Sequence, residues 1–117
     1  MMPSDAELDW SHALKTVRGN RAALATIVRT FLEEYPGRLT EMRGAVEQRT
    51  AKPLQLAAHS IKGPLRFFGA DRAFRLARHL EELGRDERME DAPAGLAELE
   101  AALASLEPRL REFITHE

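Results

Sequence analysis

Cysteine is absent from the 117-residue chain, and tryptophan and tyrosine occur once each, as Trp10 and Tyr35. Without cysteine the protein forms no disulfide, no thiolate zinc site and no cysteine nucleophile, which is compatible with a reducing compartment. With so few large aromatic residues, the core must be built mainly from leucine, alanine, isoleucine, valine and five phenylalanines. This mixture has abundant glutamate and arginine and few β-branched runs, so it favours helices.

The chain also lacks a strong charge imbalance and a long apolar run. Its formal net charge is −2, which gives no general attraction to nucleic acid or to an anionic membrane. No apolar run approaches the roughly 20 residues that a membrane-spanning helix needs, and no signal peptide is evident. We therefore expect a soluble, cytoplasmic protein that binds neither nucleic acid nor membrane. Its length suits a single domain with one core.

The longest amphipathic segment is interrupted by a proline and a glycine. Its apolar stripe keeps the same helical phase before and after Pro36-Gly37, which predicts one kinked helix rather than two separate ones. Gly19-Asn20 precedes this segment, and Asn20 is suited to cap the helix. The stripe contains Leu24, Ile27, Val28, Phe31, Tyr35, Leu39, Met42 and Val46.

Three further amphipathic segments follow, separated by helix-breaking residues. Gly69-Ala70 and Gly84 are predicted to end helices, whereas Pro53 and Pro93 suit first turns and Pro108 predicts a bend. The predicted core positions are Leu54, Ala58, Ile61, Leu65, Phe68, Ala73, Leu76, Ala77, Leu80, Leu83, Leu96, Leu99, Leu103, Leu106, Leu110 and Phe113.

These patterns predict an all-α fold, an antiparallel up-down four-helix bundle with a short extra N-terminal helix. One such bundle can bury all the apolar stripes, so we expect a monomer. The predicted segments are a leader at 1–8, a short helix at 9–17, a kinked helix at 20–49, and helices at 53–68, 71–84 and 92–115.

A polar stripe on the 53–68 helix carries the chemistry. Gln55, His59, Lys62 and Arg66 follow one another at steps of four, three and four residues, about one residue out of phase with the core stripe. The imidazole of His59 should therefore be reachable from solvent. A neutral imidazole is a good nucleophile near pH 7, because the unperturbed pKa of histidine is about 6.5. A neighbouring Lys62 favours the neutral form and can offset the charge of a bound phosphoryl group.

Gly63 is an unusual residue inside a helix, where glycine costs roughly 0.5–1 kcal/mol relative to alanine. It either allows a partner to approach His59 or allows close packing of another helix, and the sequence leaves both explanations open. Beyond it, positive charges outnumber negative ones, which could guide an acidic partner surface. From 62 to 78 the charged residues are Lys62, Arg66, Arg72, Arg75 and Arg78 against Asp71 alone. The other histidines, His12, His79 and His116, have no comparable surroundings.

Several motifs resemble the signature of histidine-containing phosphotransfer (HPt) domains, particularly those attached to hybrid sensor kinases. The resemblance covers nearly the whole chain, and its most specific part is the His-x-x-Lys-Gly pattern on a bundle helix, followed by Gly-Ala. The matching residues are Ala58-His59-Ser60-Ile61-Lys62-Gly63, Phe68-Gly69-Ala70 and Leu80-Glu81, with an upstream lead-in of Asp9-Trp10, Gly19-Asn20 and Phe31.

The resemblance implies that His59 is phosphorylated on Nε2 by a phospho-aspartyl receiver domain and passes the group to another receiver. It also implies that Lys62 stabilises the phosphoryl group and that Gly63 provides clearance. Glu81 matches a position close to the histidine, where its negative charge argues against phosphate contact and favours orienting Lys62 or a water. Pro64 stands where the family commonly has a small residue. It and Gln55 belong to the expected partner surface, with Arg66 contacting the partner.

No glycine-rich nucleotide loop and no magnesium-binding acidic cluster is evident, so we expect a phosphoryl carrier without kinase activity of its own. It would need no cofactor, because the receiver supplies Mg²⁺, and its partners would be receiver domains and a hybrid histidine kinase, covalently linked or separate. One alternative is a helical docking module that carries no phosphate. Another is the phosphotransfer domain of a chemotaxis-type kinase. A metal-binding bundle is disfavoured because no Glu-x-x-His occurs.

Overall fold

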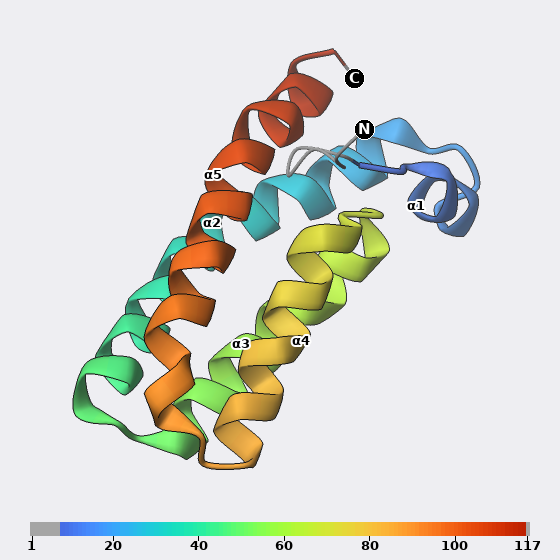
Figure 1. The fold of residues 1–117 in the computed structure, drawn as a ribbon. Coiled ribbons are helices and arrows are strands. Elements are labelled where there is room, and N and C mark those ends of the chain that lie inside the picture. Colours follow the sequence, from blue (N-terminus) through green and yellow to red (C-terminus); the bar gives the residue numbers. More distant parts are fainter. Residues whose placement is uncertain (1–7, 117) are drawn as a thin grey trace, which may run out of the picture.

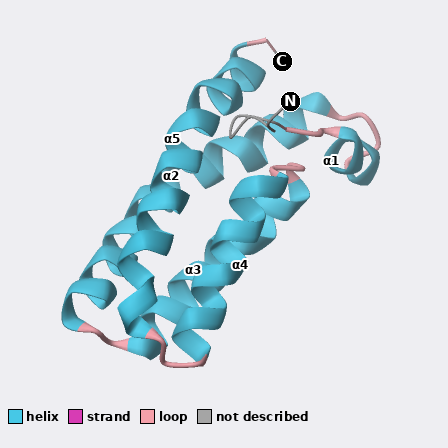
Figure 2. Cartoon of the chain, in the orientation of Figure 1, coloured by secondary structure: helices cyan, strands magenta, loops and turns pink. Residues whose placement is uncertain are grey.

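The computed structural model describes residues 8–116, and all regular elements within this range are helical (Figure 2). Four long helices form the predicted bundle, and a short helix lies near the end that carries the α3–α4 connection (Figure 1). The predicted leader lies outside the described residues except for Leu8. The elements are α1 (Ser11–Thr16), α2 (Arg21–Gln48), α3 (Ala51–Phe67), α4 (Asp71–Arg85), a 3-10 turn (Met89–Asp91) and α5 (Ala92–Thr115).

The N-terminal ends of α2 and α3 follow from local chemistry. The Asn20 side chain accepts a hydrogen bond of 3.0 Å from the Ala23 amide, so Asn20 caps α2 as predicted. α2 then continues through Pro36 as a single helix, in agreement with the unbroken phase of its apolar stripe. α3 begins at Ala51, two residues before the predicted start, which still leaves Pro53 in the first turn.

The core is formed by the predicted stripes with three exceptions. Val46 and Leu76 are only half-buried, and the prediction that Ile27 belongs to the core is wrong, because 38% of its surface is exposed. Ile27 lies at the edge of the α2 stripe, beside a groove between α2 and α3. At one end of the bundle, Trp10 packs against Phe68 and Phe113, with ring centroids 5.6 and 4.6 Å away, and so joins the N-terminal segment to the core.

Gly84 brings α3 and α4 unusually close together. α4 ends at Arg85, one residue beyond the predicted end at Gly84, and Gly84 itself is buried against α3. A Cβ atom at this position would lie 2.8 Å from the Gln55 nitrogen and 2.9 Å from the Ala51 oxygen. Asp86 is the C-cap, and the chain turns away at Glu87, which takes a positive φ of 57°. The missing side chain thus lets the two backbones touch, one turn away from His59.

Replacing Gly84 by alanine should lower the free energy of unfolding by about 1–3 kcal/mol, because the added Cβ overlaps backbone atoms that cannot turn aside. Gly44→Ala is the matched control, since nothing lies within 4 Å of a Cβ at that helical position. The control should stabilise the protein by up to about 1 kcal/mol through helix propensity. Urea unfolding followed by circular dichroism measures both, and equal effects would contradict the close-contact explanation.

Candidate functional site

His59 stands on the exposed side of α3, as the phase of its polar stripe predicts. Its side chain is 66% exposed, while the adjacent Ala58 and the nearby Ile61 are buried in the core. The backbone of α3 is held by these buried neighbours, so the imidazole projects from a rigid support into solvent. A side chain in this position is open to another protein and is still oriented by the fold.

Glu81 on α4 binds both polar groups that the sequence singled out on α3. Its Oε2 lies 2.6 Å from His59 Nδ1, and its Oε1 lies 2.5 Å from Lys62 Nζ. The Glu81 side chain is 13% exposed and that of Lys62 is 25% exposed, so the carboxylate sits at the edge of the core. The predicted link between Glu81 and Lys62 is present, whereas the bond to His59 was not anticipated from the sequence.

The contact with Glu81 determines which nitrogen of the neutral His59 ring carries the proton. An ionised carboxylate only accepts hydrogen bonds, so Nδ1 must be the protonated donor. In the neutral ring the proton on Nδ1 leaves a lone pair on Nε2. In that tautomer Nε2 is the nitrogen with a free lone pair.

The pKa of the Glu81 carboxyl is lowered overall. Partial burial alone would raise that pKa, but the hydrogen bonds from Lys62 and His59, together with their charges, outweigh it. Glu81 therefore stays ionised at neutral pH and keeps its two partners. Because the pKa in the folded protein is below that in the unfolded chain, the stability from Glu81 is present above the unfolded pKa. It is lost as the pH falls through the folded value.

Gly63 leaves open space beside His59. A Cβ atom built on Gly63 would have no atom within 4 Å, so close packing of another helix does not explain this glycine. The clearance explanation is the one that agrees with the geometry. A large side chain here would stand on the solvent face of α3, one turn beyond the imidazole.

The remaining predicted site residues spread away from His59. Gln55 is half-buried beside Gly84, and no hydrogen bond joins its side chain to the site within residues 8–116. Arg66 extends toward α4, where its guanidinium carbon lies 5.7 Å from the centre of the Phe74 ring. Pro64 is half-buried and lines the groove between α2 and α3. The structure therefore brings together only His59, Lys62 and Glu81.

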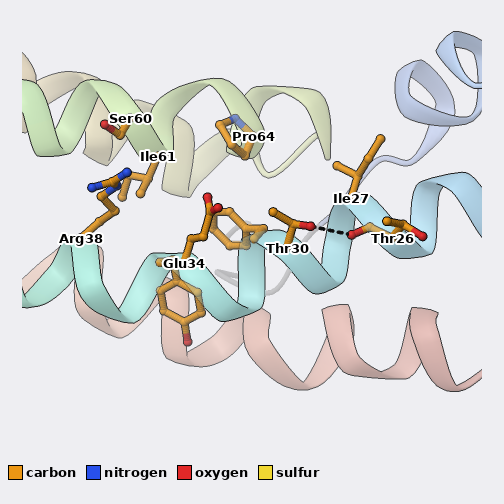
Figure 3. A pocket seen from close by; sticks show the side chains of 10 residues that line it. Thr26, Ile27, Thr30, Glu34, Arg38, Ser60, Ile61 and Pro64 are labelled. Carbon is orange, nitrogen blue, oxygen red and sulfur yellow. Dashed lines mark hydrogen bonds between the residues drawn. The ribbon is translucent and has the colours of Figure 1, made fainter.

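The groove between α2 and α3 adjoins the histidine and was missed by sequence reasoning. It has a volume of about 260 Å³, and Ile27 and Thr30 of α2 face Ser60 and Pro64 of α3 across it (Figure 3). Ile27 and Leu56, the latter 54% exposed, are the exposed large hydrophobic residues of the described chain. Leu56 precedes His59 by three positions on α3, which makes the two surface neighbours. The sequence did contain one signal of an apolar surface near His59, because Leu56 is an apolar residue that lies outside the core stripe.

Residues 8–116 contain neither a cluster suited to a metal ion nor a helix suited to a bilayer. No group of three or more histidine, aspartate or glutamate side chains is arranged to hold a metal ion. No helix in this range is both long enough and apolar enough to cross a bilayer.

Comparison with known proteins finds a matching family model and similar solved structures. The family model described as the Hpt domain matches residues 26–108. Histidine-containing phosphotransfer protein B (HptB) of Pseudomonas aeruginosa PAO1 superimposes with a TM-score of 0.85 at 23% identity, covering 94% of this chain and 96% of that one. The HPT domain of the Hpt sensor hybrid histidine kinase from Shewanella superimposes with a TM-score of 0.81 at 17% identity, covering 94% of this chain and 95% of that one. At these identities the two structures show a shared fold. No curated protein sequence matches significantly.

Substituting Glu81 by glutamine should redistribute the imidazole proton of His59, because the neutral amide no longer favours a protonated Nδ1 as the carboxylate does. Nitrogen-15 NMR of the ring should show a protonated Nδ1 and an unprotonated Nε2 in the wild type, and a mixture in the variant. Glu82→Gln is the matched control, since the neighbouring Glu82 pairs with Arg78, at 4.0 Å, rather than with His59. A ring spectrum that Glu81→Gln leaves unchanged would contradict the assigned tautomer.

Proposed function

Because the chain belongs to the Hpt domain family, and so has a histidine phosphotransfer role in a phosphorelay, we propose that His59 accepts a phosphoryl group from a phospho-aspartyl receiver domain and passes it to another receiver. The observation that carries this proposal is the hydrogen bond between Nδ1 of His59 and Glu81. It leaves Nε2 unprotonated on an exposed ring, which is the state required of a nucleophile.

The chemistry of acceptance follows from that tautomer. Nε2 attacks the phosphorus atom, the new N–P bond forms, and the bond between phosphorus and the aspartyl oxygen of the receiver breaks. No proton has to leave Nε2, so no general base is needed there. The ring gains positive charge as it is phosphorylated, and the Glu81 carboxylate, 2.6 Å from Nδ1, stabilises that charge. The same steps in reverse return the group to a receiver.

Lys62 is the proposed partner of the phosphoryl oxygens. Its ammonium group lies 2.5 Å from Glu81 and is a quarter exposed, so a short movement of a flexible side chain takes it toward Nε2. Glu81 thus holds Lys62 beside the site before the phosphoryl group arrives. The receiver supplies the phospho-aspartate and Mg²⁺, and this protein needs no cofactor of its own. We propose that it has no kinase activity and acts as a monomer.

The surface around His59 suits a short-lived complex. Gly63 leaves an unobstructed approach, and Leu56 is exposed three positions before His59 on α3. Ile27 and Pro64 add apolar surface in the groove between α2 and α3. A carrier must release each receiver quickly, so we expect an interface at the low end of the usual range, below about 1,200 Å² in total. Gln55 and Arg66 extend the proposed partner surface along α3, and a hybrid histidine kinase, linked or separate, is the proposed source of the phosphoryl group.

The alternative is a docking module that binds receivers without accepting phosphate. The apolar groove beside Ser60 would serve either function. The hydrogen bond that Nδ1 donates to Glu81 and the open space over Gly63 favour the carrier, because docking alone needs neither a defined tautomer nor a nucleophile.

Changing His59 to glutamine should abolish phosphoryl acceptance and leave the fold intact, because the side chain is largely exposed. The wild type and the variant are incubated with Mg²⁺ and receiver domains that carry a labelled phosphoryl group. Any label transferred to this protein is then tested for acid lability. His79→Gln, at an exposed histidine of α4, is the control and should be labelled like the wild type. Label on the His59 variant would refute the assignment, and binding without any label on the wild type would favour the docking module.

Replacing Gly63 by leucine should slow transfer by about 10- to 100-fold, since a misplaced nucleophile of this kind loses alignment with the phosphorus atom. The fold should keep its stability, because no atom lies near the added side chain. Gly44→Leu introduces leucine at a second open helical glycine, on α2, and should leave the rate nearly unchanged. Stopped-flow transfer kinetics and thermal unfolding separate the two effects. A rate equal to that of the wild type would argue against clearance at Gly63.

A further inference from the structure

Positive charge collects on α3 and α4 beyond Lys62. From 62 to 78 the sequence has five basic side chains and one acidic side chain, Asp71. That aspartate lies 3.1 Å from Arg75 and so compensates one of them. Arg66 forms no ion pair within the described part of the chain, and Arg78 reaches only Glu82, at 4.0 Å. Two cations therefore remain weakly compensated on neighbouring helices.

Arg66 and Arg78 are organised by one aromatic ring. Their guanidinium carbons lie 5.7 and 5.6 Å from the centre of the Phe74 ring, Arg66 from α3 and Arg78 from α4. Together with Phe74, Gly69 and Asp71, they line one surface depression of about 300 Å³. Stacking on a ring engages the guanidinium face and leaves N–H groups available at its edge.

This arrangement suits a carboxylate. The planar guanidinium presents its donors in a fork that matches the two oxygens of a carboxylate. Because both arginines are already held against Phe74, less side-chain freedom is lost when a ligand binds. Exposed arginines without a ring, such as Arg18 and Arg49, have no such preorganisation.

We propose that Arg66, Phe74 and Arg78 form a second contact site, which binds an acidic side chain of the receiver partner beside the phosphoryl transfer site. The inference rests on the proposed function, because it assumes a receiver over His59. Arg66 is one helical turn beyond Lys62, and Arg78 is one turn before Glu81. A protein that reaches His59 along α3 and α4 therefore also covers this depression. The site contributes to docking and takes no part in the chemical step.

The first experiment needs no receiver. Sodium glutarate is titrated at constant ionic strength while the side-chain N–H signals of the arginines are followed by NMR. The signals of Arg66 and Arg78 should shift along a saturating curve, and those of Arg18 and Arg49 should shift little. Equal shifts at all four arginines would overturn the site. Inorganic phosphate is titrated in parallel. If it saturated the shifts of Arg66 and Arg78 at a lower concentration than glutarate does, the carboxylate assignment would be overturned.

The second experiment measures docking separately from transfer. The double variant Arg66→Gln, Arg78→Gln is made in the wild type and in His59→Gln, and binding of purified receiver domains is followed at low salt. Its association rate constant should fall roughly tenfold, and its salt dependence should weaken, because these charges steer encounter. Arg18→Gln, Arg49→Gln removes the same net charge and should change the rate constant less than about twofold.

The outcomes distinguish the two proposals. If receivers label the wild type and the Arg66, Arg78 variant binds them as fast as the wild type, the contact site is wrong and the carrier function stands. If no receiver labels the wild type but the double variant still loses affinity, the carrier function is wrong and the contact site stands. Equal losses in both double variants would show a general charge effect and overturn the site.

Discussion

The Glu81 carboxylate, shared between His59 Nδ1 and Lys62 Nζ, is the interaction on which the site depends. It joins α4 to α3 and can exist only because the two helices lie close together. Gly84, less than one turn further along α4, removes the side chain that would push Gln55 away. The packing of two helix backbones therefore determines the protonation of an imidazole on the surface.

A phosphoryl carrier has to combine order with exposure. His59 is two-thirds exposed, but its ring is oriented by a carboxylate that is nearly buried. Burial of Glu81 would by itself oppose ionisation, and the bonds from Lys62 and His59 reverse that tendency, so its pKa is lowered. The same three groups also keep a cation ready beside the nucleophile.

The two sides of His59 offer different chemistry to a partner. Toward α2 the surface has an apolar groove lined by Ile27, and toward the α3–α4 connection it has two arginines that lie over the Phe74 ring. Apolar contacts favour close approach, whereas the charged side favours rapid encounter and one orientation. In the proposed carrier role, separating these two tasks on the surface would allow a receiver both to bind quickly and to leave quickly.

The sequence by itself determined the bundle and the reactive helix, because local rules govern both. Helical periodicity placed nearly all the core residues, Asn20 had the chemistry of a cap, and the polar stripe put His59 and Lys62 on one exposed face. Only the tertiary structure decided which residues of different helices contact one another. The exposure of Ile27, the packing role of Gly84 and the bond from Glu81 to Nδ1 all depend on the spacing of α2, α3 and α4. A helical repeat specifies which residues share a face, but the distance to the next helix is set by the side chains packed between them.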